Sequence, residues 1–409
     1  MHLYELPLVF ALIGLALYAV LAGADFGAGF WQLFAGRGSA GVRVRDHAHD
    51  SMAPVWEANH VWLIFVLTVV WTAYPEAFGS IASTLSVPLF IAAVGIIFRG
   101  GAYALRAGSP TPRELRAIDT VTAIASIITP FALGAAVGGI ASGRVPVGNA
   151  SGDLASSWLN PTSILIGVLA VATAAYLAAV YLAADAVRMR EPDLERYFRI
   201  RALGAGIGAG AIALGGLVVL HSDAHALYSD LVSGDGLVAL IVSILAGLGT
   251  LVLVWRRSYE PARYSASLAV AAIIAGWALA QNPTFLPGLT VKQAAAPHDT
   301  LVVVVVAVIV GAAILFPSLA LLFRLVLGGK LGYGETTTAS SARPAKAILS
   351  ASKPGLLARS AGACFIVGVG FLTIADAGWA HAIGIASLFA FIVLAFFAVA
   401  PAEVAGEET

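Results

Sequence analysis

The chain has 409 residues, of which 59% are hydrophobic and 11% charged, and its mean hydropathy is +0.90. This composition excludes an ordinary soluble protein, whose surface needs more charge, and it indicates a polytopic membrane protein. Basic and acidic residues both number 23, so net charge does not indicate a nucleic-acid partner. The single cysteine, Cys364, can form no internal disulfide and is interpreted as a packing residue.

Apolar segments of about 17–25 residues, long enough to cross a bilayer, recur along the whole chain. The acid near the N-terminus and the lack of a basic stretch there indicate that the first of them is a retained helix and not a cleaved signal. We predict eleven spans, at about 5–34, 54–74, 80–106, 114–141, 161–186, 201–221, 236–255, 264–281, 299–327, 356–375 and 380–401.

One connection differs from the others. Residues 328–355 are rich in Gly, Ser, Thr and Ala with scattered bases, which predicts a flexible cytoplasmic linker. The predicted organisation is therefore a membrane body at 1–327, this linker, and a C-terminal pair of transmembrane helices with a short acidic tail at 356–409.

The positions of the basic residues predict the orientation in the membrane. Twenty of the 23 Lys and Arg residues fall on one side of the predicted topology, and basic loops stay in the cytoplasm. The N-terminus is therefore expected outside and the C-terminus in the cytoplasm. This places Glu57, near the start of the second span, at the cytoplasmic face.

Four polar residues gather near the cytoplasmic ends of the first three spans: Asp25 in GADFGAG, Glu57 and His60 in WEANH, and Arg99 in IIFRGG. An acid within a span is costly and points to an ion or proton path. Glu57 and His60 are three residues apart and share a helix face. Asp25 lies between Gly23 and Gly27, whose spacing lets a neighbouring helix approach, so its carboxylate is expected to face protein.

Each of these residues also has a structural interpretation. Asp25 and Arg99 would form a buried ion pair that fixes helix register, and His60 would be a hydrogen-bonded structural histidine. Trp31, Trp56 and Trp62 are interpreted as interfacial anchors and packing residues.

Haem ligation needs His or Met inside the spans, and of eight histidines only His60 is predicted to lie clearly within one. His221 and His225 have helical spacing but border an acidic outer loop and are interpreted as solvated. No haem or metal is therefore expected to be ligated by this chain.

Five motifs together resemble subunit II of the cytochrome bd quinol oxidases. They are GADFGAG, HDSMAPVWEANHVWLI, FRGGAYALR, LNPTSILIG and NPTFLPG, and the resemblance covers about residues 1–330. It implies two four-helix bundles plus a peripheral helix, paired with a homologous subunit I that carries haem b, haem d and the site of quinol oxidation. The C-terminal helix pair lies outside the pattern.

The resemblance further implies an accessory subunit of a quinol:oxygen oxidoreductase in the bacterial plasma membrane. Such a subunit stabilises subunit I and supplies part of a cytoplasmic proton path, here through Asp25 and Glu57, with His60 as a relay. Trp56, Asn59 and Arg99 would support these groups, and a bound quinone is a further candidate cofactor.

Two positions depart from the family pattern: Ala22 replaces an acid, and His60 replaces a residue that is often Gln. Two alternatives stay open. A proton-coupled secondary transporter would have interrupted helices at matching places in two halves, but Pro130 and Pro317 do not correspond in this way. The other alternative is a purely structural membrane subunit.

Overall fold

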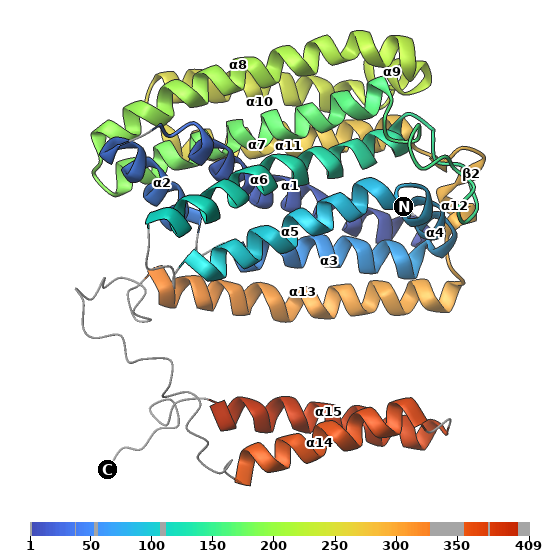
Figure 1. The fold of residues 1–409 in the computed structure, drawn as a ribbon. Coiled ribbons are helices and arrows are strands. Elements are labelled where there is room, and N and C mark those ends of the chain that lie inside the picture. The colour runs from blue at the N-terminus through green and yellow to red at the C-terminus, as the bar shows by residue number, and fades with distance from the viewer. Residues whose placement is uncertain are drawn as a thin grey trace. The chain divides into compact units, whose positions relative to one another are not determined.

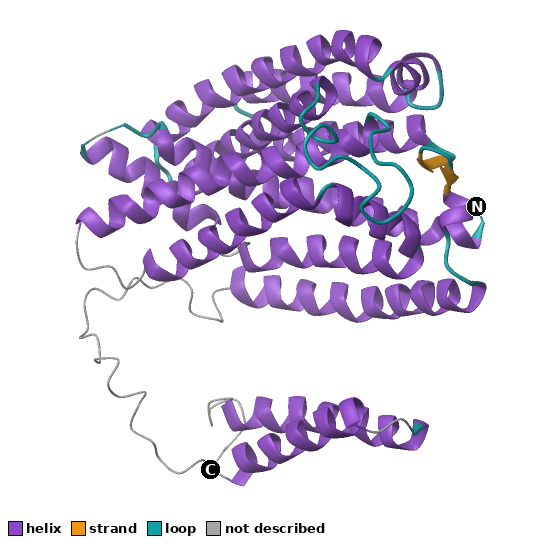
Figure 2. Ribbon diagram, turned by 45° about the vertical axis from the view of Figure 1, so that its right-hand side comes forward, coloured by secondary structure: helices purple, strands orange, loops and turns teal. Residues whose placement is uncertain are grey.

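The computed structural model describes residues 2–36, 38–52, 56–106, 112–327, 356–374 and 377–399. It divides into two compact units, Met1–Leu319 and Ala320–Thr409. The described chain is almost entirely helical, with one short hairpin of two strands (Figure 2). The predicted linker at 328–355 lies outside the described residues.

Most of the helices follow one another along the chain with short connections, whereas the longer connection 142–160 joins α6 to α7 (Figure 1). A 3-10 helix at Leu3–Glu5 leads into them, and the strands β1 (Thr284–Leu286) and β2 (Leu289–Thr290) pair antiparallel. The α-helices are α1 (Leu6–Leu33), α2 (Ser39–Met52), α3 (Trp56–Ala73), α4 (Pro75–Thr84), α5 (Ser86–Arg106), α6 (Pro112–Ala141), α7 (Pro161–Arg188), α8 (Pro192–Asp223), α9 (His225–Ser233), α10 (Leu237–Trp255), α11 (Tyr259–Gln281), α12 (Val291–Ala294), α13 (His298–Leu327), α14 (Leu356–Ile374) and α15 (Gly378–Val399).

The structure supports a multi-pass helical membrane protein. Among the described residues, seven helices are long and apolar enough to cross a membrane, and the bent pair α4–α5 makes an eighth. Shorter apolar stretches lie in α3, α14 and α15. Each predicted span thus coincides with a helix or a helix pair, while the total of eleven spans stays a prediction.

Four features differ from the sequence expectations. The predicted span at 80–106 contains parts of two helices, α4 and α5, which are bent by 81° at Leu85. Pro88 in the first turn of α5 suits this break, because a proline ring clashes with the carbonyl group four residues earlier in a continuous helix. Pro130 and Pro317 do not interrupt their spans, since α6 and α13 continue through them. The acidic outer loop contains the last turn of α8 and the helix α9, so His221 and His225 are helical.

The fourth difference is α2, a helix that was not predicted and lies between the first two predicted spans. The helix α2 has too many charged residues to cross a membrane. Its mixture of charged and apolar residues suits a helix that packs across the ends of other helices. Arg43 pairs with Glu191 at 2.7 Å, and the buried ring of His47 bonds the Leu182 carbonyl oxygen at 3.0 Å. The helix α2 therefore ties the first span to the connection between α7 and α8.

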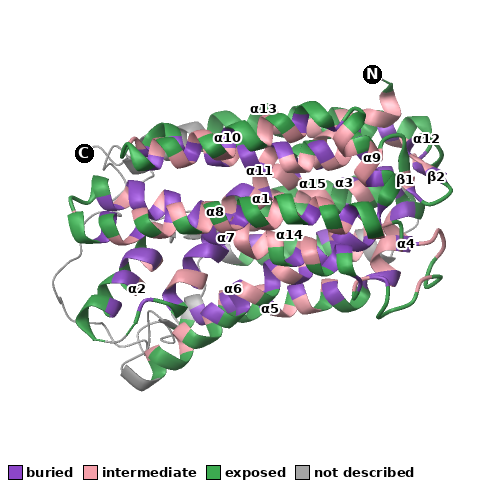
Figure 3. Cartoon of the chain, turned by 90° about the horizontal axis from the view of Figure 1, so that it is seen from above, coloured by how far each residue is buried: buried purple, intermediate pink, exposed green. Residues whose placement is uncertain are grey.

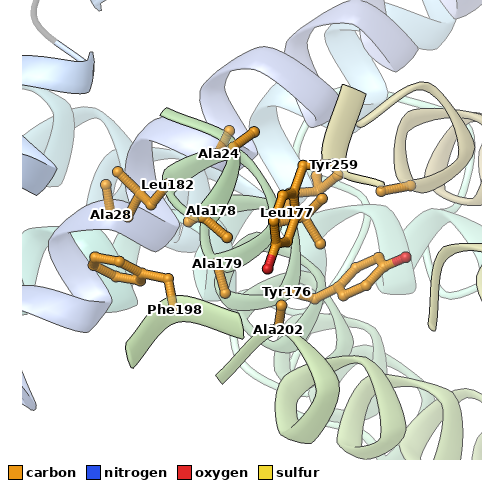
Figure 4. Packing of buried hydrophobic residues seen from close by; sticks show 14 of the residues in the cluster. Ala24, Ala28, Tyr176, Leu177, Ala178, Ala179, Leu182, Phe198, Ala202 and Tyr259 are labelled. Carbon is orange, nitrogen blue, oxygen red and sulfur yellow. The ribbon is translucent and has the colours of Figure 1, made fainter. Parts of the chain in front are cut away.

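Small side chains form much of the core where α7 packs against α1 and α8 (Figure 4). Ala24 and Ala28 of α1 pack in one buried cluster with Ala178 and Ala179 of α7. A Cβ atom added at Gly27 would lie 1.9 Å from the Ala174 carbonyl oxygen. The close approach predicted from Gly23 and Gly27 is thus confirmed, with α7 as the neighbouring helix.

Around this core, α1 also packs against α3 and α6, α5 packs against α6, and α11 packs against α7 and α10. The helix α13 lies at the edge beside α3 (Figure 1), where Val304 joins Ala11 and Val69 in a small cluster. Most of the remaining side chains described on α13 are exposed or half-buried (Figure 3). Exposed apolar side chains of this kind suit a lipid environment.

At the ends of the helices opposite α2, one carboxylate joins three elements. Asp223 at the end of α8 accepts hydrogen bonds from both Arg144 guanidinium nitrogens, at 3.1 and 2.7 Å, and from the Thr162 backbone nitrogen at 3.1 Å. We expect Arg144→Ala to lower the free energy of unfolding by about 1–3 kcal/mol, because the half-buried carboxylate loses its bidentate partner. Thermal unfolding in detergent measures this as a lower midpoint.

The exposed pair Arg188–Glu260, whose side chains are 56% and 57% exposed, gives the matched control for this prediction. Arg188→Ala should change the midpoint little, since exposed ion pairs contribute about 0–1 kcal/mol. Equal effects of the two variants would show that Asp223 does not act as a clamp.

Candidate functional site

A buried ion pair lies in the interior of the first helices. Arg99 of α5 donates to Oδ1 of Asp25 on α1, and the same nitrogen lies 2.9 Å from the Asp25 carbonyl oxygen. The two side chains are 6% and 2% exposed. The expectation that Asp25 faces protein is confirmed, and so is its pairing with Arg99. A pair buried this deeply offsets the cost of each charge only when its hydrogen bonds are well satisfied.

The Arg99 head group has further partners on two neighbouring helices. Its other terminal nitrogen donates to Oγ of Ser126 on α6, and its guanidinium carbon lies 5.1 Å from the centre of the Phe26 ring. A Cβ atom added at Gly29 would meet Ser126 Oγ at 2.1 Å and the arginine nitrogen at 2.9 Å. Gly29 is therefore needed to leave room for this contact between α5 and α6.

Several polar atoms around the pair are buried without a hydrogen-bond partner among the described residues. They include Oδ2 of Asp25, Oδ1 of Asn59 and the hydroxyl of Tyr18, and all three side chains belong to residues less than 9% exposed. Asn59 does donate to the Leu21 carbonyl oxygen at 3.3 Å, one turn from Asp25. A buried polar atom left unpaired costs about 1–3 kcal/mol, so this region is suited to hold internal water.

His60 of α3 lies on the same side of its helix as these groups. Its ring centre is 6.3 Å from that of Tyr18 and 6.4 Å from that of Phe26, both on α1. It is close enough to Asp25 and Arg99 to interact with their charges. The structure therefore brings together Asp25, Asn59, His60 and Arg99.

Two predicted site residues are only partly described. Trp56 and Glu57 form the first turn of α3, but their side chains lie outside the described residues. The shared helix face of Glu57 and His60 thus follows from their spacing alone and stays a prediction.

The sequence of the membrane body matches a known protein family. The family model described as "Cytochrome bd terminal oxidase subunit II" matches residues 3–326, most of the chain. The chain belongs to this family. The resemblance inferred from the five motifs is confirmed, and the helices α14 and α15 lie beyond the matched region.

Individual relatives of this subunit II are distant. "Cytochrome bd ubiquinol oxidase subunit 2" of Bacillus subtilis (strain 168) is 30% identical over 114 residues, covering 28% of this chain and 33% of that protein. "Cytochrome bd-I ubiquinol oxidase subunit 2" of Escherichia coli (strain K12) is 29% identical over 180 residues, covering 42% of this chain and 46% of that protein. The chain thus aligns with less than half the length of either relative.

The fold of subunit II also matches a solved structure. A chain of "The structure of bd oxidase from Geobacillus thermodenitrificans" superimposes with a TM-score of 0.65 and 25% identity. The match covers 80% of this chain and 99% of that chain. Nearly the whole of that neighbouring chain therefore has the same fold as the matched part of this chain.

Ala22, one of the two positions that depart from the family pattern, is surrounded by apolar side chains. Ala22 is 1% exposed and packs with Tyr18, Phe26 and Ala174 in a small apolar cluster. An acid at this position would be buried against aromatic and aliphatic side chains.

A cavity of about 280 Å³ lies between α1, α3, α4, α6 and α11, and Tyr18 forms part of its wall. Its wall is formed mainly by aliphatic and aromatic side chains, and its few polar groups include Tyr18, Gln281 and Asn282. Such a cavity suits an apolar chain better than a charged solute.

Sequence reasoning missed two parts of the site. Ser126 and Gly29 complete the surroundings of Arg99, although neither was selected from the sequence. Thr122, Ser126 and Thr129 are spaced by four and three residues, so they share one face of α6. This polar stripe within an apolar span was the available signal.

Proposed function

We propose that this chain is the accessory subunit of a bd-type quinol:oxygen oxidoreductase in the bacterial plasma membrane. It would pair with a subunit I that holds haem b and haem d and oxidises the quinol. The proposal gives this chain a supporting and proton-conducting role.

The buried carboxylate of Asp25 carries the proposal. An Asp at the centre of a membrane helix costs about 2.5–3.5 kcal/mol. Arg99 binds its Oδ1, while Oδ2 has no described hydrogen-bond partner. A carboxylate held by one oxygen, with the other oxygen buried and unpaired, can accept a proton and release it without moving the helix.

The path would start at Glu57 and continue through Asp25 with His60 as a relay. With the N-terminus outside, Glu57 lies at the cytoplasmic end of α3, where protons are supplied. A histidine can act as both donor and acceptor near neutral pH. Asn59 and Trp56 would position the first turn of α3, and Arg99 would fix Asp25. Water bound at the unpaired atoms of Asp25 and Asn59 would complete the connection.

The apolar cavity next to Tyr18 is the part of this chain that suits a bound quinone. Its volume of about 280 Å³ fits a section of an isoprenoid tail and not a complete quinone with its chain. The head group would then lie at the polar end of the cavity, near Gln281 and Asn282. We place no electron transfer there.

Purification from a native membrane tests the proposed assignment. The chain should co-purify with a larger haem-containing subunit, and the preparation should show the absorption bands of haem b and haem d and consume oxygen with quinol. A colourless preparation of this chain alone that moves a solute would instead support the transporter alternative.

The proton path has its own test in Glu57→Gln, which keeps the size of the side chain but cannot carry a proton. We expect the rate of quinol-dependent oxygen consumption to fall at least about tenfold, because one proton-transfer group is lost. The haem absorption spectrum should stay unchanged. Glu76→Gln, in the first turn of α4, is the matched control, and wild-type turnover in Glu57→Gln would remove this residue from the path.

A further inference from the structure

The junction between α8 and α9 presents two histidines that the proposed function does not use. His221 lies in the last turn of α8 and His225 is the first residue of α9. Both are exposed. They are on different helices because the backbone at Ala224 leaves the helical conformation, with φ −138° and ψ 58°.

Their rings are held in a defined arrangement. The ring centres of His221 and His225 are 5.0 Å apart, with the planes at 85°. Tyr228 contacts both rings, with centre distances of 5.0 Å to His221 and 6.2 Å to His225. The histidines are therefore oriented by packing on one side and open to solvent on the other.

The hydrogen bond of His225 fixes which nitrogen can bind a ligand. Its Nδ1 lies 3.2 Å from the His221 carbonyl oxygen. A carbonyl oxygen only accepts, so Nδ1 carries the proton and Nε2 of the neutral ring keeps a free lone pair. A bond from one ring nitrogen to a backbone carbonyl is the common arrangement of metal-binding histidines.

The ring separation also fits a shared ion. Two imidazoles bound to one tetrahedral ion, with metal–nitrogen bonds of about 2.0–2.1 Å, place their ring centres about 5 Å apart. Imidazole nitrogens select zinc, copper and nickel over calcium and magnesium, which prefer oxygen. Asp223 lies between the two histidines in the sequence, but its carboxylate already accepts hydrogen bonds from Arg144 and Thr162. We therefore do not count it as a metal ligand.

We propose that His221 and His225 form a surface site for a divalent transition-metal ion, Zn²⁺ or Cu²⁺. Nε2 of His225 and an unprotonated ring nitrogen of His221 supply two ligands, and water fills the remaining positions. A bound ion would join the end of α8 to the start of α9 and hold this junction in one conformation. The site does not depend on the proposed oxidase function.

Titration of the purified complex with ZnCl₂ tests this site. The complex should carry an affinity tag without histidines. We expect the wild type to bind one more Zn²⁺ than the double variant His221→Ala/His225→Ala, and each single variant to bind it at least about tenfold more weakly. His298→Ala, at an exposed histidine beside Asp299, should bind like the wild type.

Copper gives a second readout. Electron paramagnetic resonance of one equivalent of Cu²⁺ should show two coupled imidazole nitrogens in the wild type and fewer in His225→Gln, which keeps a polar side chain at the helix start. The proposal is overturned if the wild type and the double variant bind zinc with equal stoichiometry and affinity, or if His225→Gln gives the same copper spectrum as the wild type.

Discussion

Replacing Asp25 by Asn and Arg99 by Gln in the same chain should give a complex that assembles with its haems but turns over at least about tenfold more slowly than the wild type. The single variant Asp25→Asn leaves a buried unpaired guanidinium, which costs about 3–5 kcal/mol, so assembly is expected to suffer. The double variant removes both charges together. Assembly then recovers, while the proton-carrying carboxylate is still missing.

Two measurements separate the interpretations of this ion pair. The absorption spectrum reports assembly and haem content, and quinol-dependent oxygen consumption reports turnover. If the pair only fixes helix register, the double variant regains both. If Asp25 also conducts protons, only the spectrum recovers. Near-wild-type turnover in the double variant would contradict the proposed path.

A second ion pair provides the matched control. Asp185 of α7 and Arg263 of α11 are paired, with side chains 17% and 16% exposed. They lie on other helices, away from Asp25. Asp185→Asn/Arg263→Gln should therefore change stability modestly and leave turnover per assembled complex close to the wild type.

The spans could be predicted from sequence because a membrane helix must satisfy its backbone internally and expose apolar side chains to lipid. This requirement produces long apolar runs that are visible without any tertiary information. The bend between α4 and α5 was not predicted, since the apolar composition continues through Leu85 and Pro88 and hides the break. The helix α2 was missed because its charged composition resembles a loop, and its stability depends on contacts with α7 and α8.

The candidate site could likewise be predicted only in part. Asp25 could be selected because an acid within an apolar span is costly and is expected to face protein, and Arg99 was its natural partner. The glycine pattern predicted a different contact, since Gly23 and Gly27 lie on the opposite face of α1 and pack on α7. The contact of Arg99 with Ser126 depends on how α5 and α6 pack, which the sequence does not state directly. Glu57 was selected from its motif, and its role stays a prediction because its side chain lies outside the described residues.

Substituting Gly27 by Val should prevent stable assembly of the complex. A Cβ atom at this position would lie 1.9 Å from the backbone oxygen of Ala174 and 2.4 Å from its carbonyl carbon. Backbone atoms of a packed helix cannot turn aside as a side chain can, so α1 and α7 must separate along their small-residue contact. The yield of haem-containing complex after size-exclusion chromatography should fall at least about tenfold, since overpacking against backbone exceeds the usual cost of about 1–3 kcal/mol.

Gly210→Val is the matched control, because an added Cβ atom at Gly210 of α8 meets nothing within 4 Å. This variant should assemble like the wild type. A wild-type yield of Gly27→Val would show that α1 and α7 can separate without loss of the complex.

The position of Gly27 also connects this packing to the ion pair. Gly27 lies about 200° around the helix from Asp25, so one face of α1 rests on α7 while the opposite face presents the carboxylate to Arg99. Pushing α1 away from α7 would press Asp25 towards α5 and α6. A partial assembly of Gly27→Val should therefore show lower turnover per haem as well as lower yield, because the small residues of α1 hold its carboxylate at the distance that Arg99 requires.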